Sequence, residues 1–335
     1  MIKAAFMSQN LNKGLIDRVY GHESMARISK HAVIYEELIN RDNLDTHKEY
    51  LKDVEVIFST WGMPVLSKQD IERYLPKLKA VFYAAGSVQR FARPLLDRGV
   101  IVCSAWAANA IPVAEYTLAL ILLANKGFFQ NSVKTKRNHA SARDYTETFP
   151  GNYNVKVGIL GAGMVGTRVI ELLKPFSVEV LVFDPFLPDE KAEKLGVKKC
   201  SLVEIFSQCQ TVSNHVANLP STVKMLNKEH FSRMLPNATF INTGRGAQVV
   251  EEDLIKALKE IPTRTAILDV TDPEPPAPGS ELLKMENVIL TSHIAGSMGC
   301  EVERMSLYMT EEFLRYVEGK ELKYNVTLKM LETMA

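Results

Sequence analysis

The sequence predicts an α/β fold in which parallel sheets are divided over two domains. First, a chain of 335 residues exceeds what one hydrophobic core usually serves. Second, short apolar runs rich in β-branched residues alternate with helical segments along the chain. Third, a glycine-rich strand–turn–helix motif begins at residue 155 and opens a second series of such units.

The composition points to a small-molecule partner. Forty basic residues stand against thirty-nine acidic ones, and no long block of one charge occurs, which argues against nucleic-acid binding and against a polybasic membrane contact. The four cysteines form no C-x-x-C pair and no metal-ligand spacing, so we expect neither a disulfide framework nor a metal site. A reducing, cytoplasmic location fits this cysteine usage.

Four strands are expected in the first series, at 2–6, 54–58, 79–85 and 100–105, with a helix over 67–78 before the third. The N-terminal apolar run is too brief for a signal-peptide core. The apolar stretch 111–124 is shorter than a membrane span and contains Glu115, so we expect a core helix there. The polar stretch 134–154 contains Pro150 and Gly151 and predicts a loop or crossover.

The motif "VKVGILGAGMVG" carries the most specific chemistry in the chain. Its glycines follow the G-x-G-x-x-G pattern at Gly161, Gly163 and Gly166. The first suits the tight turn, the second lets backbone approach a pyrophosphate, and the third allows close packing of helix on strand. The helix that follows begins near Met164 and Val165, whose backbone N–H groups would face the phosphates. Together these features predict a Rossmann-type dinucleotide site.

The next strand, "VEVLVFD", ends at Asp184, 18 residues beyond Gly166. A carboxylate at that position accepts hydrogen bonds from the adenosine ribose and repels a 2′-phosphate. No arginine follows in "DPFLP", so the sequence predicts NAD rather than NADP as the cofactor.

Four further strands each end in polar or titratable residues. Because the carboxyl ends of parallel strands share one edge of a sheet, these side chains are expected near the dinucleotide. They are Asn214 and His215, Asn242 to Arg245, Asp269, and Thr291 to His293. His215 and Thr243 are therefore candidate cofactor contacts.

Three of the polar residues near these strand ends admit a structural alternative. An isolated histidine such as His293 is more often a hydrogen-bonded structural residue than a catalyst. Glu274, within a proline-rich connection, could be a solvated carboxylate, and Arg245 a surface ion-pair partner. The glycines that flank Arg245 in "TGRG" instead favour backbone packed around a fixed guanidinium.

Several motifs together resemble the D-isomer-specific 2-hydroxyacid dehydrogenases. They span nearly the whole chain: "VIFSTWGMP", "LPKLKAVFYAAGS", "NAIPVAEYTLALIL", "VGILGAGMVG", "NHVANLPST", "FINTGRGAQVVEEDL", "AILDVTDPEP" and "VILTSHIAG". The resemblance implies that Arg245 binds substrate, that Glu274 is the carboxylate partner, and that His293 is the acid/base, in contact with substrate and cofactor. It further implies that Asp269 holds the nicotinamide carboxamide, and that Gly86 and Ser87 offer backbone N–H groups to the substrate carboxylate.

The resemblance also implies the architecture. Residues 1–105 with 300–335 would form a flavodoxin-like substrate domain, and 106–299 an inserted Rossmann-type NAD-binding domain, with the active site in the cleft between them. Homodimerisation through the Rossmann-type domain is implied as well.

The expected function is reversible hydride transfer between NAD(H) and a small 2-hydroxy or 2-oxo acid of D configuration. Two alternatives remain: a NAD-sensing, corepressor-like binding protein, and a formate dehydrogenase-like enzyme, a branch expected to carry Gln in place of Glu274. Departures from the family pattern include the absence of an acidic residue in "AAGSVQRF" and the unusual Trp61 and Arg90. Glyoxylate, hydroxypyruvate, a phosphorylated acid and a bulkier 2-oxo acid all stay open as substrates.

Overall fold

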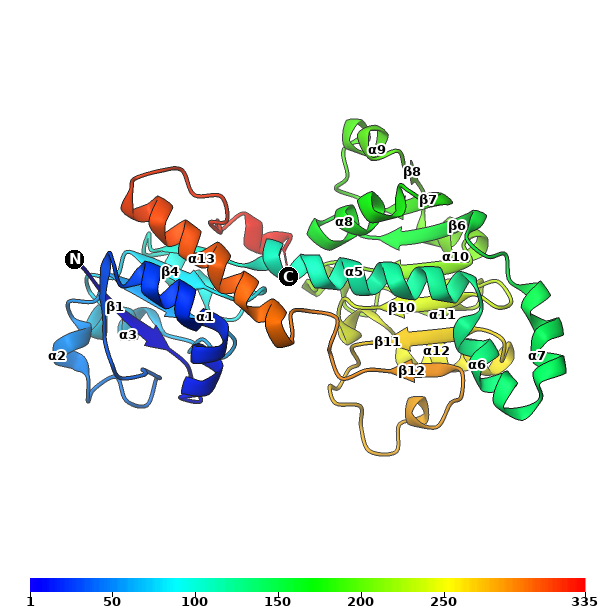
Figure 1. The fold of residues 1–335 in the computed structure, drawn as a ribbon, viewed down its shortest axis with the longest axis horizontal. Helices are drawn as coiled ribbons and strands as arrows, with labels where there is room; N and C mark the ends of the chain where they lie inside the picture. The colour runs from blue at the N-terminus through cyan, green and yellow to red at the C-terminus, as the bar shows by residue number, and fades with distance from the viewer. Residues whose placement is uncertain (335) are drawn as a thin grey trace. The chain divides into compact units, whose positions relative to one another are not determined.

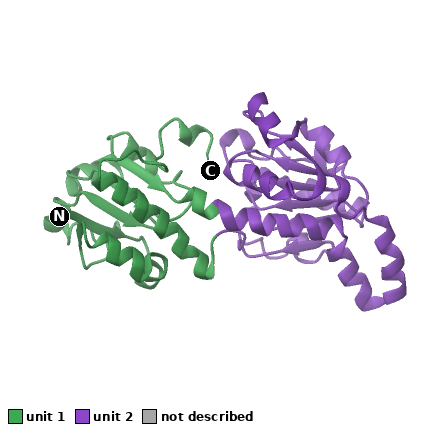
Figure 2. Ribbon diagram, turned by 45° about the horizontal axis from the view of Figure 1, so that its top comes forward, with its two compact units in different colours: residues 1–109, 297–335 green, residues 110–296 purple. Residues whose placement is uncertain are grey.

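The chain divides into two compact units, shown in Figure 2 in a computed structural model that describes residues 1–334. Unit 1 combines Met1–Asn109 with the segment that begins at Ser297, and unit 2 is Ala110–Gly296. The sequence-based boundaries, after residues 105 and 299, differ from these by a few residues. The long helix α5 (Trp106–Asn125) contains the first boundary.

Unit 1 is built on a parallel sheet of five strands in the order β2-β1-β3-β4-β5. This is the flavodoxin-like order, as expected. The sequence did not predict β2, an edge strand of only three residues. The strands are β1 (Ile2–Met7), β2 (Ala32–Ile34), β3 (Val56–Ser59), β4 (Ala80–Tyr83) and β5 (Ile101–Ser104).

Helices cover both faces of this sheet (Figure 1). On one face Phe58 and Phe82 pack edge-on against Phe313 of α13. The helix predicted over 67–78 is α3, which ends at Tyr74 because Pro76 disfavours helical backbone at the residue before it. The helices are α1 (Lys13–Ile28) and α13 (Val302–Val317) on that face, and α2 (Lys48–Leu51), α3 (Lys68–Tyr74) and α4 (Ala92–Leu96) on the other.

Unit 2 is built on seven parallel strands in the order β12-β11-β10-β9-β6-β7-β8. From β6 the chain adds strands outward on one side and then on the other, which is the Rossmann topology. The direction reverses between β6 and β9, where such sheets bind their ligands. The strands are β6 (Tyr153–Leu160), β7 (Ser177–Phe183), β8 (Lys198–Lys199), β9 (Thr211–Asn214), β10 (Thr239–Asn242), β11 (Thr265–Leu268) and β12 (Val288–Leu290).

Two helical layers cover this sheet. Helix α5 is long and apolar enough to span a membrane by length and composition, but Ala114, Leu120 and Ile121 pack in the core of unit 2, as expected for a core helix. One layer contains α5, α8 (Met164–Leu173) and α9 (Asp189–Leu195); the other contains α10 (Leu202–Gln208), α11 (Lys228–Phe231) and α12 (Glu251–Glu260). Short 3₁₀ turns are η1 (Thr146–Thr148), η2 (Pro220–Thr222), η3 (Gly246–Gln248), η4 (Glu281–Leu283), η5 (Gly299–Glu301) and η6 (Met330–Glu332).

The prediction of an irregular loop or crossover over residues 134–154 is largely wrong. Two helices form a hairpin there (Figure 1), α6 (Phe128–Arg137) and α7 (His139–Tyr145). Helix α6 buries no side chain and α7 buries only Ala142, so the sequence carries no apolar period that would indicate a helix. Local capping contributes instead, because the Asn138 side chain accepts a 3.1 Å hydrogen bond from the Ser141 N–H.

Candidate active site

The glycine-rich turn between β6 and α8 has three glycines with three different environments. Gly161 has a φ of 86°, and a Cβ there would lie 2.8 Å from the His215 carbonyl oxygen. A Cβ on Gly166 would lie 1.9 Å from the Gly161 oxygen, so only glycine lets the helix pack this closely. A Cβ on Gly163 would meet nothing within 4 Å. Open space at the middle glycine is what close approach of a pyrophosphate to the backbone requires.

Helix α8 begins at Met164, directly after this turn. The N–H groups of Met164 and Val165 lie in its first turn, where an α-helix has no internal acceptors. Asp184, at the end of β7, is held beside the same turn, because its carboxylate accepts hydrogen bonds from the Ala162 N–H at 2.7 Å and the Phe186 N–H at 2.8 Å. Each carboxylate oxygen keeps a lone pair for a further donor, such as a ribose hydroxyl.

His215, which follows β9, is held by two hydroxyl groups. Its Nε2 lies 2.9 Å from Ser213 Oγ, and its Nδ1 lies 3.3 Å from Thr243 Oγ1. Burial lowers the pKa of His215 to about 3, because the charged ring would lose its hydration. The ring is therefore neutral at physiological pH, and its two nitrogens exchange one donor and one acceptor role with the hydroxyls.

This burial predicts a pH-dependent stability. The pKa of His215 in the folded protein lies below its ordinary value of 6.5. The contribution of neutral His215 to the free energy of unfolding is therefore complete above pH 6.5 and is lost as pH falls toward 3. We expect His215→Asn to reduce the stability loss between pH 7 and pH 5 by about 2 kcal/mol. Urea unfolding followed at both pH values measures this, with His139→Asn, an exposed histidine on α7, as control. An equal pH dependence in wild type and His215→Asn would contradict it.

The backbone around Arg245 is fixed by a buried amide network. Asn214 Nδ2 donates to Asn242 Oδ1 at 3.0 Å and to Gln248 Oε1 at 2.6 Å. Asn242 Nδ2 in turn donates to the Arg245 carbonyl at 3.1 Å, and the Arg245 N–H donates to Gln248 Oε1 at 3.3 Å. The strand-end pattern identified Asn214 and Asn242 but missed Gln248, which lies in a 3₁₀ turn with no distinguishing sequence signal.

The glycines of "TGRG" surround this arginine as the sequence predicts. A Cβ on Gly246 would lie 2.0 Å from the Thr271 carbonyl carbon, so backbone passes backbone at van der Waals distance. Arg245 Nη1 donates to the Gly244 oxygen at 2.7 Å. Burial lowers the pKa of Arg245, and the negative charge of Glu274 opposes that effect. The remaining guanidinium N–H groups bond no other residue within 1–334 and can bind a ligand.

His293 and Glu274 form a pair. The His293 Nδ1 lies 2.7 Å from Glu274 Oε1, and their side chains are 44% and 42% exposed. A proton on Nδ1 therefore points to the carboxylate, and Nε2 bonds no group in the described part of the chain. A histidine held this way can exchange a proton through Nε2 with a bound molecule. Glu274 also acts electrostatically on Arg245, so unit 2 brings the three predicted catalytic residues together.

The loop that carries His293 is organised by Asp269, which is buried at the end of β11. Its Oδ1 accepts hydrogen bonds from Thr291 Oγ1 at 2.6 Å and from the Ile294 N–H at 2.8 Å, and its Oδ2 from the Ala295 N–H at 3.0 Å. The His293 N–H donates to the Asp269 carbonyl, and His293 has a left-handed φ of 60°. Asp269 therefore holds the loop of residues 291–295 in place.

The other predicted substrate-binding residues, Gly86 and Ser87, lie in unit 1 after β4. The one hydroxyl proton of Ser104 is shared between the carbonyl oxygens of Ala85 and Gly86, both within hydrogen-bond distance of Oγ, and so holds this turn. Trp61, after the neighbouring strand β3, is partly exposed.

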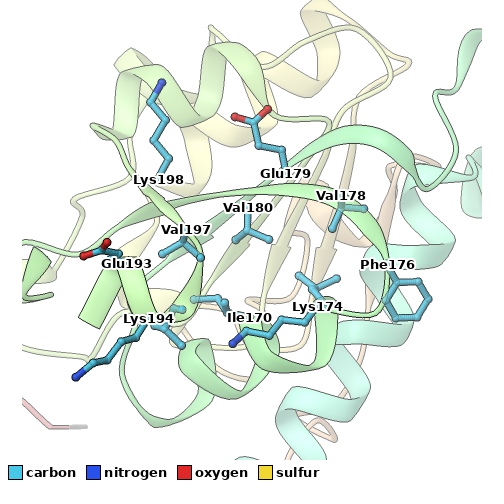
Figure 3. A pocket seen from close by; sticks show the side chains of 13 residues that line it. Ile170, Lys174, Phe176, Val178, Glu179, Val180, Glu193, Lys194, Val197 and Lys198 are labelled. Atoms are coloured by element: carbon cyan, nitrogen blue, oxygen red, sulfur yellow. The ribbon is translucent and has the colours of Figure 1, made fainter. Parts of the chain in front are cut away.

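A surface hollow of about 830 Å³ lies elsewhere on unit 2 (Figure 3). Its walls come from the end of α8, the first half of β7, the end of α9 and the start of β8. Asp184 follows the opposite, carboxyl end of β7, and none of the predicted site residues lines the hollow. Geometry therefore separates it from the dinucleotide motif.

Comparison with known proteins decides the family. Residues 118–295, more than half of the chain, match the model of the D-isomer specific 2-hydroxyacid dehydrogenase, NAD binding domain. The chain belongs to this family.

Curated relatives in the 2-hydroxyacid dehydrogenase family carry several names. D-3-phosphoglycerate dehydrogenase of Methanocaldococcus jannaschii is 31% identical over 83% of this chain and 52% of its own length. Glyoxylate reductase of Korarchaeum cryptofilum is 28% identical over 81% of this chain and 82% of its own. The chain spans about half the length of the phosphoglycerate dehydrogenases it matches.

Solved structures show the same fold at lower identity. Apo D-mandelate dehydrogenase of Rhodotorula graminis has a TM-score of 0.80 at 20% identity, covering 97% of this chain and 98% of that one. A phosphoglycerate oxidoreductase from Rhizobium etli has a TM-score of 0.78 at 21% identity, covering 99% and 100%. The two-domain 2-hydroxyacid dehydrogenase fold predicted from the sequence is thus confirmed.

Proposed function

We propose that this chain is a NAD-dependent D-2-hydroxyacid dehydrogenase that interconverts a 2-oxo acid and the corresponding D-2-hydroxy acid. The observation that carries the proposal is the 2.7 Å pair of His293 and Glu274, within electrostatic reach of the half-buried Arg245. All three follow or lie near the carboxyl ends of strands in the sheet that bears the glycine-rich turn. A proton donor and a fixed cation beside a dinucleotide site suit reduction of a carbonyl.

In this mechanism each group has one task. The backbone N–H groups of Gly86 and Ser87 bind the substrate carboxylate, and Arg245 binds the 2-oxo acid and stabilises charge that grows on the carbonyl oxygen. NADH, when bound, supplies the hydride that adds to C2. Protonated His293 gives its Nε2 proton to the same oxygen, and Glu274 stabilises the charged ring before transfer. The products are the D-2-hydroxy acid, the oxidised cofactor NAD⁺ and a neutral histidine, which takes up a proton from water to complete the cycle.

Asp184 supports NAD over NADP as the cofactor. Its carboxylate already binds the glycine-rich turn, so a 2′-phosphate beside it would meet a fixed negative charge. We expect a higher kcat/KM with NADH than with NADPH, and Asp184→Ser should narrow the difference. Initial rates with both cofactors measure this; equal wild-type values would refute the assignment. Glu179→Gln, earlier on the same strand, is the control for a charge change alone.

We also propose that the protein is cytoplasmic and that it forms a homodimer through unit 2. Helix α6 buries no side chain within the chain and leaves Phe128 50% exposed, together with Val133. Apolar side chains on an otherwise unburied helix favour contact with a second copy. We expect a dimer in sedimentation velocity and a shift toward monomer in Phe128→Asp. A monomeric wild type would contradict the proposal.

The test of the proposed function is NADH consumption with a panel of 2-oxo acids. Glyoxylate, hydroxypyruvate, a phosphorylated 2-oxo acid and a bulky apolar one cover the open substrates. Steady turnover of one or more, with formation of the D-hydroxy acid, supports the proposal. NADH binding without turnover of any would indicate a binding protein instead, and NAD reduction by formate would indicate a formate dehydrogenase.

A further inference from the structure

The loop that follows β4 is held in place by contacts with β5 and with the C-terminal segment. On one side, the Ser104 hydroxyl shares its one proton between the Ala85 and Gly86 carbonyls, which orients the peptide groups that precede Ser87. The same Ser104 donates its N–H to the Tyr324 carbonyl at 3.1 Å, so the C-terminal segment lies along β5 at this point. Ser104, at the end of β5, is therefore hydrogen-bonded both to the loop and to the C-terminal segment.

The C-terminal segment is anchored there by a buried carboxylate. Glu312 of α13 is 1% exposed, and its Oε2 accepts hydrogen bonds from the N–H groups of Lys323 and Tyr324, both at 2.9 Å. Two residues further on, the Val326 N–H donates to the Val102 carbonyl at 2.7 Å. These bonds direct residues 327–334 toward the loop.

Gln89, in the loop after β4, bonds directly to the C-terminal segment. Its Nε2 donates to the Leu331 carbonyl at 2.8 Å and to the Met334 carbonyl at 2.6 Å. Leu331 is 5% exposed and belongs to the same hydrophobic cluster as Val88, the residue between Ser87 and Gln89. The segment 327–334 therefore contacts the loop through one side-chain amide and one buried side chain.

We propose that residues 327–334 position the substrate-binding loop, and that Gln89 is the positioning residue that couples them. The inference rests on the proposed function, in which the Gly86 and Ser87 N–H groups bind the substrate carboxylate. Backbone donors stabilise an anion well only when they are held in place before it binds. Gln89 does not touch the reacting atoms. It lies two residues beyond Ser87 and fixes the loop there through its two hydrogen bonds to the C-terminal segment.

The experiment compares Gln89→Met, Leu331→Ala and their double variant with a control on the same segment, Lys329→Ala, whose side chain is exposed. Methionine keeps the shape of Gln89 and removes both donors. We expect KM for the accepted 2-oxo acid to rise about tenfold in Gln89→Met, as the loss of one or two net hydrogen bonds predicts. A similar rise is expected in Leu331→Ala, which removes the buried side chain that packs in the cluster of Val88. The kcat and the Kd for NADH should change less than twofold, and the two substitutions should be less than additive because they loosen the same contact.

Amide hydrogen exchange of residues 85–88 gives a second measurement that needs no substrate. It should be faster in Gln89→Met and Leu331→Ala than in wild type, and unchanged in Lys329→Ala. A wild-type KM in Gln89→Met would overturn the inference while leaving the proposed function intact. If wild type turns over no 2-oxo acid, the proposed function fails by itself, and the coupling is then decided by exchange, where wild-type rates in Gln89→Met would overturn it.

Discussion

His293→Ala is expected to lower kcat for 2-oxo acid reduction by about 10²- to 10⁴-fold, the usual contribution of a positioned acid or base. The Nε2 that delivers the proton is lost, whereas the glycine-rich turn and Asp184 are untouched, so the Kd for NADH should stay near that of wild type. Single-turnover absorbance of NADH measures the chemical step, and fluorescence titration measures binding. His139→Ala on α7 is the matched control. A kcat within threefold of wild type would remove His293 from the mechanism.

The partner of His293 is tested by removing its charge. The Glu274 carboxylate lies 2.7 Å from His293 Nδ1 and orients the ring that donates the proton. In Glu274→Gln the hydrogen bond can remain but the charge is gone, so the single-turnover rate of 2-oxo acid reduction should fall about tenfold, as the loss of a charge-assisted hydrogen bond predicts. A wild-type rate in Glu274→Gln would mean that Glu274 does not act on His293, even if the histidine is catalytic.

Arg245→Lys is expected to reduce kcat/KM for every accepted 2-oxo acid by about 10²-fold or more. Lysine keeps the charge but lacks the planar fork that can bind a carboxylate or carbonyl with two parallel donors. It also cannot repeat the Nη1 bond to Gly244 while it faces a ligand. The Kd for NADH should change little. Arg18→Lys, an exposed arginine on α1, controls for the substitution itself. Wild-type kcat/KM in Arg245→Lys would mean that the arginine is structural.

The features that follow from local geometry were predictable from the sequence. The glycine spacing predicted a turn in which Gly161 and Gly166 admit no Cβ and Gly163 faces open space. The rule that parallel strands end at one edge predicted that Arg245 and His293 lie at the same edge of one sheet, and the structure adds the Glu274 contact. Both arguments need only the strand pattern and the positions of polar residues after it.

The features that depend on tertiary contacts were not predictable in this way. Helices α6 and α7 bury almost nothing, so no apolar period marks them. Gln248 and Gln89 are single amides in irregular segments, and their importance comes from partners 34 and 242 residues away. The resemblance implied that Asp269 binds the cofactor. The structure adds that its carboxylate accepts hydrogen bonds from the backbone N–H groups of Ile294 and Ala295, and the sequence gives no sign of this because any residue has such an N–H group.

The insertion of unit 2 into unit 1 has a consequence for the order in which a newly made chain can fold. Unit 2 is continuous in sequence, so a ribosome releases all of it before unit 1 is complete. The strands that carry Phe58 and Phe82 emerge early, but Phe313, which packs on both, is translated more than two hundred residues later. The part of this sheet face that α13 covers therefore stays exposed during most of synthesis, although α1 on the same face is made early. We expect the N-terminal hundred residues alone to aggregate or bind chaperones, and residues 110–296 alone to fold.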